Sequence, residues 1–475
     1  MSRFAQYPSR NPPRKPAISP PVAVSEPDAT ATASAGAPPN SKPSKENQSF
    51  RSAESDPLRR IGLVFALGYI VVRFGTLSEI GTFGFGYKTH LVSIFGPPAV
   101  LLCFLSGGLR RALQERPAWF MAAFILWLPL TIPFSVYRRG ALMKILESYL
   151  TEMPMFFMVA GLVLTLSDVR ILMRLLAVCF LINVAAANIF SFKQQVDGVE
   201  RQAMLFGTIA NSNDLAAHLM TLMPFMLMAV VTSKGLFSFW RVVGIPALLG
   251  GLWLIIRTGS RGGLVTLMVV GMFVLIRANL GQRVAILTGL LALGVAVLIF
   301  MPAMVERFMT LGETRGQAVA AAGSYQSRVY LLQQSIIITL KNPLLGVGPG
   351  QFEVAENDAA RERGMRRGYW LATHNTYTAV SSETGIPGVV FFTGAFLGAG
   401  VALNRFHRRI RKISGLESMS DMVFYTLLSM TGLAVAMMFG TFTYQYYVPF
   451  MVGLCLVLMR TLRREIQQQE RQLLL

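Results

Sequence analysis

The chain has 475 residues, of which 53% are apolar and only 14% are charged. Soluble domains carry roughly a quarter charged residues, so this composition excludes an ordinary soluble protein and predicts an integral membrane protein. The net charge of +20 is interpreted as Lys and Arg that orient helices in a lipid bilayer, and no nucleic-acid partner is expected.

Residues 1–57 are predicted to form a disordered cytoplasmic tail. They are rich in Pro, Ser, Ala and Lys and contain almost no large apolar residues, so they cannot bury a core. They also lack the apolar core of a signal peptide behind a short basic start, so the tail is expected to stay on the mature protein.

From Ile61 onward the sequence predicts an all-α polytopic membrane protein with about twelve transmembrane helices. Nine spans are expected in a first membrane domain at 58–301, and the last three in a second at 383–460, followed by a short cytoplasmic tail at 461–475. The expected spans are residues 61–78, 90–106, 118–135, 147–166, 171–191, 214–232, 240–257, 262–277, 283–301, 383–403, 422–439 and 442–460.

The distribution of Lys and Arg predicts the orientation of these spans. Alternate short connections are basic, for example around residues 110–116 and 405–412, and are expected in the cytoplasm with both termini. The connection around 138–144 is the main exception. The long polar segment at 302–382 is then extracytoplasmic.

Arginines recur in three segments that are expected to meet on the outer side. The segment around 200–214 contains Arg201 and Asn213, the Gly-rich segment around 257–263 contains Arg257 and Arg261, and the long loop contains Arg328. Any one of these arginines could simply anchor to headgroups. Arg261 is the hardest to explain in that way, because an arginine so near the hydrocarbon needs a partner and its flanking glycines allow a ligand to approach. Phosphate suits a guanidinium group, which binds it through paired hydrogen bonds.

Of the histidines, His374 is the candidate for chemistry. It lies near the end of the long loop beside Asn375, and an unperturbed imidazole titrates near pH 6.5. Like-charge repulsion from Arg328, Arg361 and Arg367 would keep it neutral and competent as a base. His218, inside the sixth span, is interpreted as a structural residue. Cys103, Cys179 and Cys455 lie in apolar runs without a C-x-x-C pattern and are expected to be apolar filler.

Several of these motifs resemble the O-antigen ligase and Wzy-type polymerase superfamily. Ser260-Arg261-Gly262-Gly263 is similar to its S-R-G-[GA] signature, and His374-Asn375-x-Tyr377 with Glu383-x-Gly385-Ile386-x-Gly388 is similar to its H-N block. The segment that precedes the H-N block in this family is similar to residues 342–348 together with Arg328. An earlier periplasmic element of the family is similar to Arg201 together with residues 207–213. Ser212 departs from the proline that is common between the two asparagines.

The resemblance implies a metal-independent, inverting glycosyltransferase of the GT-C type in the inner membrane of a bacterium, with its active site on the periplasmic face. The donor would be a glycan on undecaprenyl diphosphate. Arg201 and Arg261 would act in catalysis with His374 as the base, and Arg328, Asn213, Asn375 and Arg257 would bind substrate. No cofactor is expected. The acceptor stays open between a glycan repeat unit, lipid A core and a protein hydroxyl.

The residues alone agree with this resemblance on charge. A departing diphosphate needs a divalent metal or arginine, and the outer segments offer arginines but no D-x-D carboxylate pair. The alternative is a transporter or flippase for an anionic polyprenyl-linked lipid, although no internal repeat relates the two halves. A structural scaffold would leave the His374 and Arg261 segments unexplained.

Overall fold

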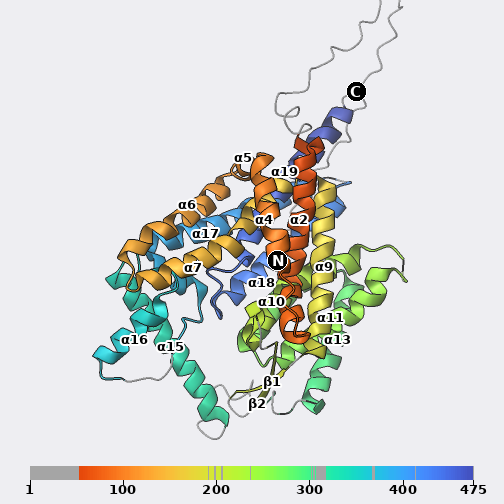
Figure 1. Ribbon diagram of the computed structural model, residues 1–475. Helices are drawn as coiled ribbons and strands as arrows, with labels where there is room; N and C mark the ends of the chain where they lie inside the picture. The colour runs from red at the N-terminus through yellow and green to blue at the C-terminus, as the bar shows by residue number, and fades with distance from the viewer. Residues whose placement is uncertain are drawn as a thin grey trace, which may run out of the picture. The chain divides into compact units, whose positions relative to one another are not determined.

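The computed structural model describes residues 53–473, apart from 191, 197–198, 205–206, 236, 301, 303–304, 306–316, 366–369, 412 and 414 (Figure 1). Most of the predicted N-terminal tail therefore lies outside the described residues. The described elements, in chain order, are α2 (Pro57–Phe74), α3 (Leu77–Glu79), the π-helix η1 (Ile80–Gly84), α4 (Leu91–Leu105), α5 (Gly108–Ala112), α6 (Arg116–Thr131), the 3-10 helix η2 (Ile132–Phe134), α7 (Arg138–Thr151), α8 (Pro154–Leu162), α9 (Leu166–Ile189), β1 (Phe192–Val196), β2 (Val199–Ala203), the 3-10 helix η3 (Gly207–Ile209), α10 (Ser212–Thr232), α11 (Phe239–Arg257), α12 (Arg261–Arg277), α13 (Leu280–Phe300), α15 (Gln317–Lys341), α16 (Phe352–Glu362), α17 (Thr376–Ile410), α18 (Glu417–Ala436) and α19 (Tyr447–Leu473).

The all-α polytopic class predicted from the sequence is confirmed. Among the described residues, seven helices are long and apolar enough to cross a membrane, or eight if the bent pair at Pro57–Phe74 and Leu77–Gly84 is one span. The shorter apolar helix α4 adds to these. This count does not establish the predicted number of about twelve.

Two segments differ from the expected spans. The single span expected at 147–166 is wrong, because α7 ends at Thr151 and α8 begins at Pro154. Proline suits the first turn of a new helix, where its missing N–H is not needed. The second difference is a two-stranded antiparallel sheet, β1 with β2, in a chain that was expected to be wholly helical.

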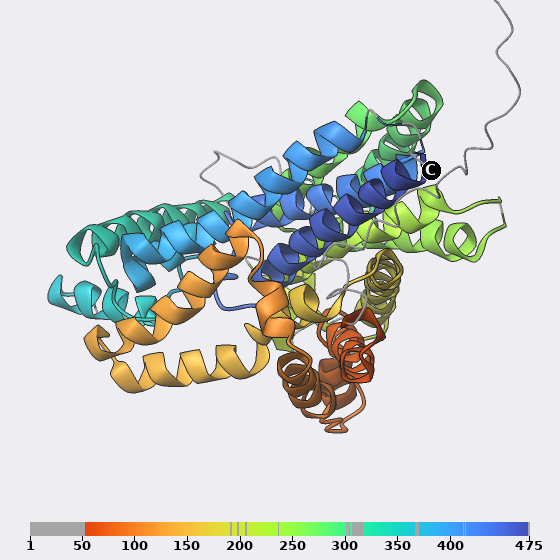
Figure 2. The same cartoon turned by 90° about the horizontal axis from the view of Figure 1, so that it is seen from above.

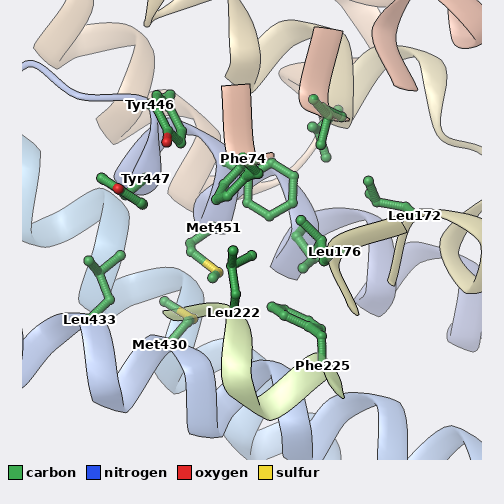
Figure 3. Close-up of a cluster of buried hydrophobic side chains, with 14 of the residues drawn as sticks. Phe74, Leu172, Leu176, Leu222, Phe225, Met430, Leu433, Tyr446, Tyr447 and Met451 are labelled. Carbon is green, nitrogen blue, oxygen red and sulfur yellow. The ribbon is translucent and has the colours of Figure 1, made fainter. Parts of the chain in front are cut away.

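Helix α10 forms the centre of the bundle. It is the most deeply buried of the candidate spans, and it packs against α9, α11 and α18. Beside it, the Phe74 ring meets Tyr446 edge-on, with centroids 4.7 Å apart, within a cluster of aromatic and aliphatic side chains (Figure 3). Nδ1 of His218 lies 2.7 Å from the Tyr447 hydroxyl oxygen, in agreement with a structural role for this histidine. Because lipid tails are as apolar as these side chains, close packing and hydrogen bonds hold such helices together.

Helix α17 is kinked where a glycine-rich turn docks against it. Gly385 has φ +73° and ψ −176°, and a Cβ there would lie 2.3 Å from the Leu344 carbonyl oxygen. The Ser382 carbonyl accepts a hydrogen bond from the Val347 N–H at 2.9 Å, so the turn satisfies a backbone group near the kink. Figure 2 shows α15 running alongside the N-terminal part of α17, with which it packs. The motif residues at 342–348 and 383–388 thus support each other structurally.

Candidate active site

Arg201 lies on strand β2 and connects three segments. In the hairpin register Gln194 is paired with Arg201, whose side chain is buried. Its Nε donates to the Thr258 carbonyl oxygen at 2.7 Å, and its Nη2 donates to Oδ1 of Asn213 at 3.1 Å. The arginine therefore joins the hairpin, the first turn of α10 and the turn between α11 and α12. The first two arginine segments meet, as the sequence predicted.

The turn between α11 and α12 presents Arg261 at a helix start. Arg257 is the last residue of α11 and Arg261 is the first of α12, so the break expected between residues 257 and 262 is confirmed. Ser260 caps α12 by accepting a hydrogen bond from the Gly263 N–H at 3.1 Å. The helix dipole makes such a start favourable for an anion.

The glycines after Arg261 allow other parts of the protein to approach. A Cβ on Gly262 would lie 2.6 Å from the Cβ of Phe439, and one on Gly263 would lie 2.9 Å from the Cβ of Ala216. Either contact is too short to exist without a shift. These glycines are thus explained by packing against α10 and the α18–α19 connection, without a ligand.

His374 directly precedes Asn375, the residue that caps the start of α17. It has φ +51°, and its side chain is half-buried. Asn375 caps the helix: its Oδ1 accepts from the Thr378 N–H at 3.1 Å, while its Nδ2 donates to the Met438 carbonyl oxygen at 3.3 Å. Asn375 therefore fixes the backbone that carries His374.

The connection between α18 and α19 links the histidine to the arginines. The Thr376 N–H donates to the Met437 carbonyl oxygen at 2.8 Å, and the Thr376 hydroxyl donates to the Gly440 carbonyl oxygen at 2.7 Å. Phe439, in the same connection, packs against Gly262. The starts of α12 and α17 are consequently held against a common segment, residues 437–442.

Two influences lower the pKa of His374. The larger is burial, and the second is the positive charge of Arg328 on α15. The neighbouring charge expected from Arg328 is therefore present. Arg361 is exposed on α16, and Arg367 lies outside the described residues. A lowered pKa favours the neutral imidazole, which can accept a proton.

Arg257 stands apart from the other candidates. Its side chain makes no hydrogen bond or ion pair within the described part of the chain. In the same described part, no three His, Cys, Asp or Glu side chains gather closely enough to hold a metal ion.

A buried ionic cluster that was not predicted from the sequence links α2 with the end of α7. Arg73, at the end of α2, forms an ion pair with Glu152 and lies 3.9 Å from Glu79. Its guanidinium also lies over the Tyr446 ring, 4.9 Å from the centroid. The sequence carried a signal for it, because Arg73 lies inside the span expected at 61–78 and Glu152 inside the one expected at 147–166. A charged residue inside a span is costly unless it has a partner.

Comparison with known families identifies one region of the chain. The family model described as O-antigen ligase matches residues 246–393, from the middle of α11 to the first half of α17. The match includes Arg257, Arg261, Arg328, His374 and Asn375 and leaves Arg201 and Asn213 outside. No curated protein matches the chain.

Proposed function

We propose a specific reaction of glycan ligation or polymerisation for this multi-pass membrane protein, whose residues 246–393 match the O-antigen ligase family. The reaction is transfer of a glycan from undecaprenyl diphosphate to an acceptor hydroxyl. The acceptor oxygen attacks the anomeric carbon as the bond from that carbon to the diphosphate breaks, so the configuration inverts. The hydroxyl proton passes to His374, and the diphosphate leaves with the electron pair of the broken bond.

Arginines stabilise the departing diphosphate in this proposal. Arg261 stands at the capped start of α12, where the helix dipole adds to its charge. Arg201 is held by Thr258 and Asn213, so its charge is positioned before the substrate arrives. Asn213 acts as a positioning residue through Arg201. Arg257 and Arg328 supply further positive charge.

His374 serves as the general base. Burial and Arg328 both lower its pKa, so the imidazole is neutral at pH 7 and can take the proton of the acceptor hydroxyl. Asn375 acts as a positioning residue, because its hydrogen bonds orient the first turn of α17.

A single observation carries the proposal. Phe439 packs against Gly262, beside Arg261, while its neighbours Met438 and Gly440 hold the two residues that follow His374. The arginine-bearing and histidine-bearing helix starts therefore face a common segment. A base and a cationic leaving-group site on opposite sides of one anomeric carbon need that kind of proximity.

The site faces the extracytoplasmic side in this proposal, with both termini in the cytoplasm and residues 302–382 outside. Support comes from α17, whose 35 residues exceed the roughly 20 that a bilayer needs and which carries basic residues around Arg408 at the end opposite to His374. Reporter fusions at residue 360 test this orientation, and a cytoplasmic signal there would contradict it.

Transfer by the purified protein is the decisive test. Protein in detergent is incubated with a polyprenyl-diphosphate glycan and candidate acceptors, and the released polyprenyl diphosphate is measured together with the product. A transferase breaks the glycan–diphosphate bond. A transporter in liposomes would instead move the donor between leaflets with that bond intact, and this outcome would contradict the proposal.

A further inference from the structure

A polar cavity lies beside the proposed base. Its volume is about 370 Å³, within the range of small-molecule sites. It is an open cavity lined by residues of α7 and the start of α16, by residues 441–445, and by Gly350, Ala372, Thr373 and Glu383. Thr373, which lines the cavity, directly precedes His374 in the chain, and the histidine itself is not among the lining residues.

Several buried polar atoms at this cavity have no partner. Ser148 Oγ, Glu152 Oε2, Thr443 Oγ1 and Gln445 Oε1 are buried and make no hydrogen bond to any described residue, and all of these residues line the cavity. Ser148 and Thr443 are each only 1% exposed. Leaving such groups unsatisfied is unfavourable, so their presence around one cavity indicates a polar ligand there.

The charge of the lining excludes a diphosphate as the ligand. Arg73 pairs with Glu152, and the remaining carboxyl groups of Glu147, Glu353 and Glu383 still outnumber Lys144, so a diphosphate would be repelled. The acidic groups instead suit hydroxyl donors, since carboxylate oxygens accept hydrogen bonds. Burial raises the pKa of Glu353, and Lys144 opposes that rise.

We propose that this cavity binds the acceptor sugar, whose hydroxyl groups pair with the unsatisfied oxygens and present the attacking hydroxyl to His374. This assignment rests on the proposed transferase function. It divides the site by charge, because the diphosphate lies on the side of the arginines and a hydroxyl-rich, uncharged sugar lies on the side of the carboxylates. Glu152 connects the cavity to α2, because its Oε1 forms an ion pair with Arg73 at the end of that helix.

The assignment is tested by sugar binding without any donor. The probes are methyl glycosides of glucose, galactose, rhamnose and N-acetylglucosamine, and binding to the full-length protein in detergent is measured by saturation-transfer NMR. The variants Ser148→Ala and Thr443→Val remove cavity hydroxyls with little change in shape. Because these hydroxyls have no protein partner, both variants should fold with unchanged thermal stability.

The expected result is that at least one glycoside binds the parental protein and that each variant weakens this binding by roughly three- to tenfold. The matched control is Thr461→Val, because the Thr461 hydroxyl donates to the Val457 carbonyl within α19, away from the cavity. Control protein and Arg261→Ala protein should bind the glycoside normally. Absence of binding to the parental protein, or equal binding by the cavity variants, would overturn the assignment.

Transfer kinetics separate this idea from the proposed function. In an active enzyme, Thr443→Val should raise KM for the acceptor by the same factor and leave KM for the donor unchanged. A rise confined to the donor KM would overturn the acceptor assignment while transfer itself stands. Sugar binding without any transfer would contradict the proposed function instead.

Discussion

The Tyr444 hydroxyl donates a hydrogen bond to Oε2 of Glu383 at 2.7 Å, joining the α18–α19 connection to the kinked helix α17. The same oxygen accepts from the Gly350 N–H at 2.9 Å. Burial, and then the charge of Glu383, raise the pKa of Tyr444 well above its ordinary value, so the tyrosine stays protonated as a donor. One carboxylate thus fastens two loops to the helix that follows His374.

Removal of this hydrogen bond should destabilise the protein. Tyr444→Phe is expected to lower the free energy of unfolding by about 1–3 kcal/mol, because it leaves a buried carboxylate oxygen with one donor fewer. Thermal unfolding in detergent measures the effect. Tyr425→Phe is the matched control, since the Tyr425 hydroxyl makes no hydrogen bond within the described part of the chain. Equal unfolding temperatures for the two variants would contradict the expectation.

Arg201→Lys should be almost as harmful to transfer as Arg201→Ala. A lysine cannot replace the two separate donors that reach Thr258 and Asn213, so its charge would be misplaced even though it is retained. We expect about a 10²-fold loss of rate, comparable with removal of one transition-state donor. The measurement is transfer activity at matched protein levels. Arg408→Lys, an exposed substitution near the far end of α17, serves as the control. Full activity of Arg201→Lys would instead favour headgroup anchoring.

The pH dependence of transfer should report the environment of His374. Its pKa is lowered, so the neutral base predominates at pH 7 and the rate should fall only as the pH drops below about 6.5. Arg328→Gln removes the charge that lowers this pKa, so the acid limb of the rate profile should move to higher pH. Rate profiles between pH 4.5 and 8 test this shift, and an acid limb at the same pH in both proteins would rule out the assigned electrostatic contact.

Transfer should not require a divalent metal. The proposal assigns compensation of the diphosphate charge to arginine, in a chain whose outer segments lack a D-x-D pair. Addition of EDTA to the purified protein should therefore leave the transfer rate unchanged. Loss of activity that magnesium or manganese restores would show that arginines alone are insufficient.

The elements that the sequence could predict are those with strong local signals. The break at Thr258-Gly259-Ser260 was visible as a small polar interruption between two apolar runs, and Ser260 indeed caps α12. The proximity of the arginine segments followed from the alternation of spans. The positive charge of Arg328 was expected to act on His374, and it does lower the pKa of that histidine.

Other features depend on tertiary contacts that the sequence does not display. The kink at Gly385 and the cap at Asn375 are stabilised by segments distant in the chain, and the cavity forms between elements from three separate regions. The hairpin was detectable, because Asp197-Gly198 is a common turn dipeptide between two short extended segments. Glu152 likewise indicated a break in the span expected at 147–166, because a charged residue inside a membrane span is costly.

The most direct test of the account is the transfer rate of His374→Ala protein at saturating donor and acceptor. Thermal unfolding and binding of the polyprenyl-diphosphate donor should match the parental protein, which separates loss of chemistry from loss of fold. The account predicts a rate lower by about 10²–10⁴-fold, the usual contribution of a general base. A folded His374→Ala protein that binds donor and transfers glycan at the parental rate would contradict it.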